Sequence, residues 1–275
     1  MLYEYSFGDF YLRHASDDEP DDRNFSMHIH EMCEIYFFIS GDVKYLVEGS
    51  EYMLEENSLL ILRPAEAHNP KILSQKKYER FAINFPIRFA ESIDPCGRLT
   101  RMFIDKQLGK NNLFRCTEID TKLIKKLFSK MCEEMEDYEK QLTIKTHLLF
   151  ILDTLTRAYT AKSRLEYSTP SVAERIVTYV NAHLFEDISV PVIAKHFYLS
   201  PSQFSRVFKQ ATGATPWEYI TKKRLTAAKE KIAAGTPARL VAEECGFGDY
   251  SAFYRAFTKH FSTFPTSDEN IVRAK

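Results

Sequence analysis

Cysteine, long apolar runs and glycine-rich loops are all scarce in this sequence of 275 residues. The five cysteines are an odd number without CxxC spacing, which argues against both a disulfide framework and a zinc finger. No apolar run approaches the roughly 20 residues of a membrane-spanning helix, and the N-terminus lacks the basic and apolar regions of a signal peptide. Phosphate-binding loops, dinucleotide fingerprints and catalytic triads are not evident either. These absences predict a cytoplasmic protein with reduced cysteines and no membrane partner.

The net charge of −1 hides an asymmetry along the chain. From residue 171 onward there are 14 Lys and Arg against 10 Asp and Glu, whereas the first 170 residues carry 23 against 28. A modestly basic C-terminal third is compatible with a polyanionic partner, but many solvated helical surfaces reach the same balance. Charge alone therefore does not identify the partner.

The C-terminal third contains one pattern written twice. Phe204–Pro216 and Phe253–Pro265 carry Phe, Arg, Phe and Pro at matching places, 49 positions apart. A period of this length, carried by whole helices and turns, indicates two copies of one small module. The alternative is an ordinary bundle of amphipathic helices, which does not by itself require matching motifs.

Helix start signals divide each copy into two helices. They are Ser171 with Glu174, Ser200-Pro201 with Gln203, Thr215-Pro216 with Glu218, Thr236-Pro237, and Asp249. The predicted helices are Pro191–Phe197, Pro201–Ala211, Pro216–Ala234, Pro237–Cys245 and Tyr250–His260. Each copy is therefore a helix-turn-helix, and the helix between the copies would be about 28 Å long. That length is close to the roughly 34 Å between successive major-groove faces of B-DNA.

The second helix of each module has an outward face suited to DNA. Apolar residues form the inward stripe, so the remaining residues face out: Ser202, Gln203, Ser205, Arg206 and Lys209 in the first copy, and Ser251, Ala252, Tyr254, Arg255 and Lys259 in the second. We predict that Arg206 and Arg255 read bases, because arginine bridges guanine O6 and N7. Lys209 and Lys259 suit phosphates. Gln203 has two possible uses, base contact or the capping box.

From about Ile176 to Pro265 the sequence resembles the AraC/XylS family of transcription regulators. The matching motifs are Ile193-Ala194, Leu199-Ser200, Phe204-Ser-Arg-Val-Phe-Lys209, Gly213, Arg224-Leu225, Ala228, Gly246-Phe247, Asp249, Ser251 and Phe253-Tyr-Arg-Ala-Phe257. The resemblance implies sequence-specific binding to double-stranded promoter DNA and transcriptional control, usually activation, with RNA polymerase as a further partner. Ala238, Ser262 and Asp268-Glu269 depart from the family pattern, so we expect the second module to be the weaker one.

Residues 25–89 alternate short apolar runs with turn signals, which predicts an antiparallel sheet folded into a sandwich or small barrel. Within it, His28-Ile-His30-x-x-x-Glu34 and Pro64-Ala-Glu-Ala-His68 resemble the cupin pattern. On a strand, even-numbered positions share a face, so His28, His30, Glu34 and Tyr36 would project together. The predicted effector-binding residues are His28, His30, Glu34, Tyr36, Arg63 and His68. A small-molecule pocket is the preferred interpretation, and a sugar is one candidate effector. The alternatives are histidines without a ligand and a functional metal site.

Residues 120–160 change to helical spacing and predict two helices. These helices either cover the sheet or form a dimer interface, and in the resembled family this segment commonly dimerises. We predict a homodimer with its seam at Leu123, Leu127, Met131 and Met135.

The predicted fold class is α+β multidomain: a cupin-like antiparallel β-barrel plus two helices, followed by an all-α double helix-turn-helix. The predicted domains are an effector-sensing domain at 1–119, a dimerisation hairpin at 120–160, a linker at 161–170 and a DNA-binding domain at 171–268. We predict a regulator that is not an enzyme and has no cofactor. The rival hypotheses are a metal-dependent cupin enzyme with an appended helical domain, and a degenerate regulator that acts through protein contacts.

Overall fold

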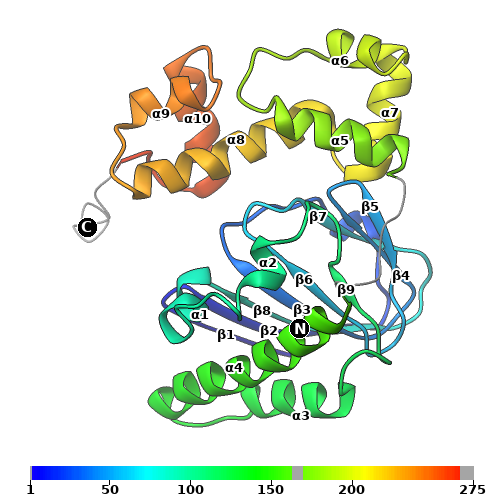
Figure 1. Cartoon of the computed structure of the whole chain (residues 1–275), viewed down its shortest axis with the longest axis vertical. Coiled ribbons are helices and arrows are strands. Elements are labelled where there is room, and N and C mark those ends of the chain that lie inside the picture. The colour runs from blue at the N-terminus through cyan, green and yellow to red at the C-terminus, as the bar shows by residue number, and fades with distance from the viewer. Residues whose placement is uncertain (1, 163–169, 267–275) are drawn as a thin grey trace.

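The computed structural model describes residues 2–162 and 170–266, which form a β-rich part and a helical part stacked on it (Figure 1). No helix in these two ranges has the length and hydrophobicity needed to span a membrane. The prediction of an α+β multidomain protein is confirmed. Most of the predicted linker, residues 163–169, and the departures at Asp268 and Glu269 lie outside the described residues.

The β-rich part contains two antiparallel sheets. The strands are β1 (Tyr3–Phe7), β2 (Phe10–Asp17), β3 (Cys33–Ser40), β4 (Val43–Val47), β5 (Ser50–Met53), β6 (Leu59–Leu62), β7 (His68–Ile72), β8 (Tyr78–Phe85) and β9 (Leu113–Phe114). One sheet has the order β1-β2-β8-β3-β6-β9 and the other the order β5-β4-β7. The predicted barrel is therefore two facing sheets whose strand pairing does not run continuously from one to the other in the described residues.

Strand β3 shows how both faces of the larger sheet are apolar. Its odd-numbered residues, such as Ile35 and Phe37, belong to the core beneath the helices. Its even-numbered residues, such as Tyr36 and Phe38, pack against β4 inside the sandwich. Because successive side chains on a strand point to opposite faces, one continuous apolar run serves two cores.

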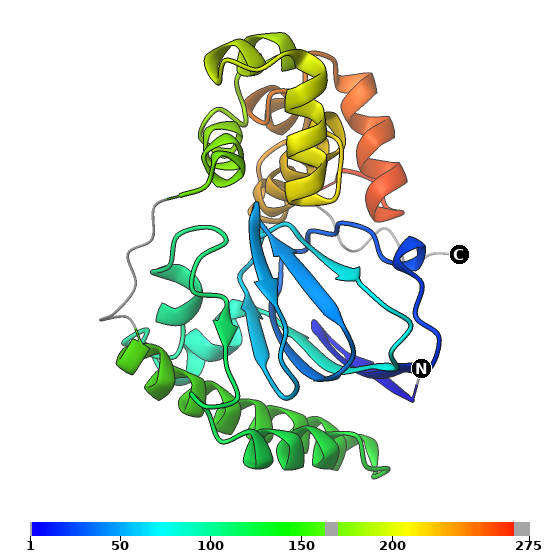
Figure 2. The ribbon, with the colours of Figure 1, turned by 90° about the vertical axis from the view of Figure 1, so that its right-hand side faces the viewer.

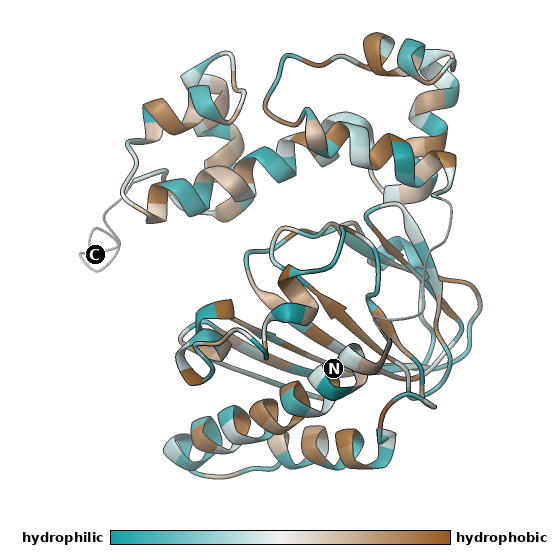
Figure 3. Ribbon diagram, in the orientation of Figure 1, coloured by the Kyte–Doolittle hydropathy of each residue, from teal (hydrophilic) through white to brown (hydrophobic). Residues whose placement is uncertain are grey.

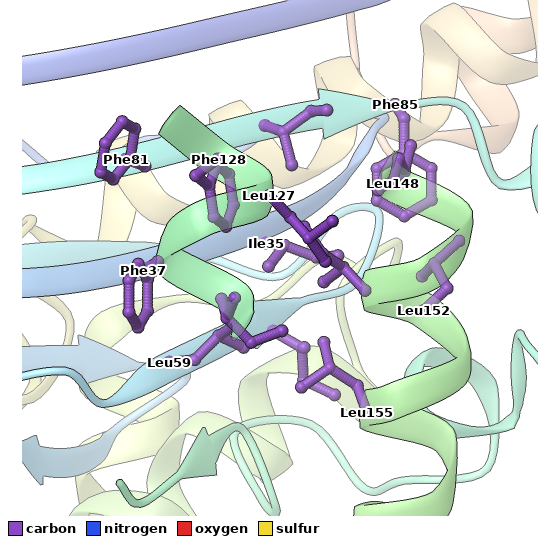
Figure 4. Packing of buried hydrophobic residues seen from close by; sticks show 14 of the residues in the cluster. Ile35, Phe37, Leu59, Phe81, Phe85, Leu127, Phe128, Leu148, Leu152 and Leu155 are labelled. Carbon is purple, nitrogen blue, oxygen red and sulfur yellow. The ribbon is translucent and has the colours of Figure 1, made fainter. Parts of the chain in front are cut away.

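Four helices belong to this part: α1 (Ile87–Ile93), α2 (Arg101–Ile104), α3 (Thr121–Met131) and α4 (Asp137–Lys162). A short 3₁₀ helix, η1 (Asp22–Asn24), precedes β3. Helices α3 and α4 cover the outer face of the larger sheet, with Phe128 and Leu148 among the residues packed on it (Figure 4). Figure 3 shows apolar and polar residues alternating along both helices, as expected for helices with one buried side.

The burial of α3 corrects the predicted dimer seam. Leu127 and Met131 belong to the core of the sensor domain and are 9% and 0% exposed. Their side chains are occupied by the sheet, so they are not available to a second copy. Leu123 is exposed and Met135 is half-buried. Helical spacing correctly indicated an apolar face, but the face belongs to this chain's own core.

The C-terminal part is all helical: α5 (Val172–Ala182), α6 (Val190–His196), α7 (Pro201–Thr212), α8 (Pro216–Ala233), α9 (Ala238–Glu244) and α10 (Tyr250–Phe261). The predicted capping boxes of α5, α7 and α8 are all formed. Helix α8 connects a first module, α5 to α7, with a second module, α9 and α10 (Figure 1). Figure 2 shows α7 and α10 in the upper part of the molecule, above the strands.

The boundaries of α6 to α10 differ from the predicted ones by at most one residue at either end. Helix α4 begins at Asp137, within the predicted helical segment 120–160, and α8 has 18 residues where 19 were expected. Helix α9 begins at Ala238, with Pro237 as its N-cap and without a side-chain cap, so Thr236 does not play the predicted role. These differences leave the two helix-turn-helix units intact.

Candidate DNA interface and sensor site

Helix α7 presents the outward face that the sequence predicted. Phe204 and Phe208 are fully buried, whereas Arg206 and Lys209 are exposed. Ser202 is exposed as well, and Ser205 is half-buried.

Gln203 is committed to the helix start, because its side-chain oxygen accepts from the Ser200 backbone N–H at 2.9 Å. The structure therefore shows Gln203 in the capping box, the second of its two predicted uses.

Helix α10 repeats this arrangement with one difference. Phe253 and Phe257 are buried, and Arg255 and Lys259 are exposed. Ser251 and Ala252 are exposed too, and their backbone N–H groups both donate to the Asp249 carboxylate. Tyr254 stacks on Phe264 with ring centroids 6.0 Å apart. That contact makes Tyr254 part of the module's own surface packing.

Arg224 of α8 ties the two modules together, a role that the sequence analysis missed. Its guanidinium donates to the backbone carbonyls of Leu184 and Glu186 in the first module, both at 2.8 Å. It also donates to the carbonyl of Gly246 in the turn of the second module. Three carbonyls from two modules converge on one buried side chain, which restrains the modules relative to each other.

A hairpin of the sensor domain docks into the first module. The turn between β4 and β5 has Glu48 and Gly49 at φ 48° and 86°, the geometry of a two-residue type I′ hairpin. Gly49 lies against Val177 of α5, where an added Cβ would stand 3.0 Å from the valine side chain. Ser50 donates to Glu174 of α5 at 2.8 Å.

Glu48 at the tip of this hairpin is buried and fully hydrogen-bonded. One carboxylate oxygen accepts from the Ala67 backbone N–H at 2.7 Å and from Lys223. The other accepts from Asn181 at 3.1 Å and from Tyr219. We call Glu48, Asn181, Tyr219 and Lys223 the interdomain lock. The lock stabilises docking because every oxygen that leaves water finds donors in the other domain.

Apolar packing surrounds the interdomain lock. Met27, Ile29 and Ala67 of the sensor domain belong to the same buried cluster as Val177 and Phe208 of the first module. The sensor domain and the first module therefore share one core. The sequence analysis did not predict this interface. The Glu48-Gly49 pair indicates a tight turn, but not what that turn contacts.

The predicted histidines do converge, although not along one strand. Strand β3 starts at Cys33, so His28 and His30 lie before it, and His28 pairs with His68 through an isolated bridge. His30 Nε2 lies 2.8 Å from Glu34 Oε2, and His68 Nε2 lies 3.4 Å from the same oxygen. Asn84, which the sequence analysis did not single out, donates to Glu34 at 3.2 Å.

Burial and charge set the protonation of this histidine cluster, which consists of His28, His30, Glu34 and His68. The protein atoms packed around the ring of His28, together with the neighbouring His68, lower its pKa, although part of the side chain reaches solvent. Burial opposes protonation of His30 as well, but the hydrogen bond and charge of Glu34 outweigh it and raise the His30 pKa. Burial alone would raise the pKa of Glu34, yet its contacts with His30 and His68 hold that pKa well below the ordinary value. Glu34 is therefore a carboxylate, and His28 is neutral.

Two predicted effector residues have structural partners. Tyr36 is buried inside the sandwich, and its hydroxyl is hydrogen-bonded to that of Tyr78. Arg63 donates to the backbone carbonyl of Lys106 at 3.3 Å. The histidine cluster is thus the part of the predicted site where several polar side chains meet.

These features define a class: a regulator with a β-sandwich sensor docked on a double helix-turn-helix. Comparison with known families identifies it further, since the AraC-like ligand binding domain matches residues 10–152, more than half of the chain. A helix-turn-helix domain family matches residues 193–269. The chain belongs to the AraC family and is a DNA-binding transcriptional regulator with a ligand-binding domain.

The chain is also similar to individual proteins. The chain is 22% identical over 245 residues to the HTH-type transcriptional activator RhaS of Escherichia coli, covering 88% of this chain and 86% of RhaS. It is 37% identical over 99 residues to the probable transcriptional regulator LumQ of Photobacterium leiognathi, covering 36% of this chain but only 40% of LumQ. Among solved structures, ToxT of Vibrio cholerae aligns over 94% of this chain and 97% of ToxT, with 14% identity and a TM-score of 0.42.

Proposed function

We propose that this regulator reads two adjacent major-groove segments of a promoter with α7 and α10 and activates transcription when its sensor domain binds a small molecule. The observation that carries the proposal is the pair of capped helices with exposed Arg206 and Arg255 on matching faces. Helix α8 separates them and is about 27 Å long for its 18 residues. One chain with this spacing suits a site of two successive major-groove segments, one helical turn apart, on one side of the duplex.

The exposed arginines and lysines suit different parts of the DNA, the bases and the phosphate backbone. Arg206 and Arg255 lie near the middle of their helices and suit guanine edges. Lys209 and Lys259, one turn later, suit phosphates. Gln203 is assigned to the helix cap, so it is no longer a preferred base contact.

Fluorescence anisotropy with promoter fragments from the neighbouring genes tests this assignment. Arg206→Ala should cost about 1–3 kcal/mol and relax selectivity at one base position. Arg255→Ala should have the same kind of effect and a smaller one, as expected for the weaker module. Lys209→Ala should weaken all sequences together and flatten the dependence on salt. Unchanged affinity and selectivity in Arg206→Ala would remove Arg206 from base reading.

Dimerisation has a better candidate surface than the predicted seam. Tyr138, Leu142 and Phe150 of α4 are large apolar side chains that are 78%, 55% and 60% exposed. Leu123 of α3 is a further large apolar side chain of these two helices and is 39% exposed. We infer that a second copy packs there. Leu142→Glu should shift the protein to monomer in analytical ultracentrifugation, whereas Glu139→Gln on the same helix should not.

The effector, the further partner and the location are also proposals. A sugar stays one candidate effector, and RNA polymerase stays a proposed partner. The relatives are regulators, which supports a non-enzymatic role over a cupin enzyme. We propose that the protein acts in the cytoplasm, because its promoter DNA would lie there.

A further inference from the structure

The turn between α6 and α7 has a bulky side chain at a backbone position that favours glycine. Tyr198 has φ 56°, in the left-handed region, where a Cβ is sterically strained and an aromatic residue is uncommon. Its side chain is 97% exposed. In residues 2–162 and 170–266, its hydroxyl has no hydrogen-bond partner and its ring packs on no other ring. Tyr198 therefore adds strain to the free protein without adding packing.

The second module forms the same turn with a glycine. After α6, the N–H of Tyr198 donates to the Lys195 carbonyl at 3.1 Å, and the next N–H reaches back five residues to a carbonyl at 2.9 Å. At the matching place after α9, the N–H of Gly246 donates to the Glu243 carbonyl at 3.0 Å, and the next N–H again reaches back five residues, at 2.9 Å. This is the Schellman motif, whose left-handed residue is usually glycine. Gly246, at φ 76°, follows that preference and Tyr198 does not.

The two turns also differ in charge. Lys195 is exposed in the last turn of α6, and no carboxylate pairs with it in the described parts of the chain. The residue at the same place in the second turn is Glu243, which is exposed as well. A lysine and a phenol hydroxyl both donate to phosphate oxygens, whereas a carboxylate repels them. The turn of the first module therefore suits a polyanion, and the turn of the second does not.

The first turn lies where a DNA backbone passes a helix-turn-helix. Side chains at the N-terminus of a recognition helix contact base edges, while the first helix of the motif crosses the backbone. Tyr198 lies between these two helices, two residues before Ser200, the N-cap of α7. Figure 1 shows α6 on the side of the first module that faces away from the sensor domain. A side chain at this place can reach the phosphates beside the bases that α7 would read.

We propose that Tyr198 is a DNA-contacting residue of the first module, and that its hydroxyl donates to a backbone phosphate next to the segment that α7 reads. Strained residues cluster at functional sites, and a strained residue without a partner in the free protein gains one in this complex. The contact positions the module and reads no base. This inference rests on the proposed function, because it adds a contact to the same protein–DNA interface.

Tyr198→Phe removes only the hydroxyl and so tests the phosphate contact. The affinity of the full chain is measured by fluorescence anisotropy with a promoter fragment and with a duplex of scrambled sequence. We expect Kd to rise about 3–10-fold for both duplexes, the effect of one hydrogen bond. Because tyrosine is neutral, the slope of log Kd against log salt should stay that of the wild type, whereas Lys209→Ala flattens it. An unchanged Kd, or a loss confined to the promoter fragment, would overturn the phosphate contact.

Tyr198→Gly and Tyr198→Ala separate the contact from the strain. Both variants lack the ring, so both should bind DNA at least as weakly as Tyr198→Phe. Only glycine relieves the left-handed strain, so the midpoint of thermal unfolding should rise by about 1–3 °C in Tyr198→Gly and stay unchanged in Tyr198→Ala. A variant that is more stable and yet binds DNA more weakly has not lost affinity through misfolding. If Tyr198→Gly binds both duplexes as tightly as the wild type, Tyr198 does not contact DNA.

The same titrations distinguish a failure of this inference from a failure of the proposed function. A wild-type protein that binds neither duplex would remove the proposed function and the contact at Tyr198 with it. A wild-type protein that binds the promoter fragment, with all three variants binding it equally well, keeps the proposed function and loses the contact. In that case, a loss of transcription in vitro by Tyr198→Gly would assign the exposed ring to a protein partner instead of DNA.

Discussion

The two helix-turn-helix modules share a sequence pattern but differ in what surrounds them. The core of the first module includes Met27, Ile29 and Ala67 of the sensor domain. The core of the second is built from α8, α9 and α10, without sensor residues among those described. The sensor domain therefore packs directly against the first module, whereas the core of the second module is built by helices of the C-terminal part. We propose that a ligand in the sensor domain would change the position of one recognition helix relative to the other.

The modules also end their recognition helices differently. Both α7 and α10 finish with a residue in the left-handed region, Gly213 at φ 80° and Ser262 at φ 55°. Glycine adopts this conformation without strain, whereas serine pays a steric cost for its Cβ. The departure of Ser262 from the family pattern is thus a difference in backbone strain, and it favours the first module.

The largest expected effect comes from opening the interdomain lock with Lys223→Ala. Lys223 and Glu48 have side chains that are 5% and 0% exposed, and breaking such a pair costs about 3–5 kcal/mol. The domains avoid part of this cost by separating, because water then solvates Glu48. We expect urea unfolding to split into two transitions, one for each part of the chain.

Lys231→Ala is the matched control for this change. Lys231 lies on the same helix and pairs with Glu244, but both side chains are about 40% exposed. Exposed pairs contribute about 0–1 kcal/mol, so a single transition should remain. If Lys223→Ala also unfolds in one transition at the wild-type midpoint, the lock does not hold the domains together.

Local signals and long-range contacts explain how much of this molecule was predictable. A capping box such as Ser200 with Gln203 is encoded within four residues, so the starts of α5, α7 and α8 and the repeat were found correctly. Glu48 and Lys223 are 175 positions apart, and nothing near either residue indicates its partner. The helical spacing of Met131 predicted the apolar face of α3, but it did not predict that the sheet of the same chain covers this face. The histidine cluster lies between these cases, because its residue types were found but its assembly from the loop before β3 and the start of β7 was not.

A smaller effect separates strain from docking at the end of α7. Gly213→Ala places a Cβ in the left-handed region, which costs about 1–2 kcal/mol, and 2.2 Å from Asn69 Nδ2. Gly235→Ala, at φ 93° with nothing within 4 Å of the added Cβ, carries the strain without the collision. The free energy of unfolding should therefore fall further in Gly213→Ala. Equal losses in the two variants would mean that Asn69 moves aside and that the interface is not tight there.

Ser262→Gly should have the smallest effect, with the opposite sign. Relief of the left-handed strain gains about 1–2 kcal/mol, while the greater freedom of glycine in the unfolded chain loses about 0.4–1 kcal/mol. The balance is a stabilisation of about 0.5–1 kcal/mol, measured by urea unfolding. Ser262→Ala keeps a Cβ at φ 55° and should be close to neutral. If Ser262→Gly is no more stable than Ser262→Ala, strain at this residue does not distinguish the second module from the first, and its weaker character must be sought at Ala238.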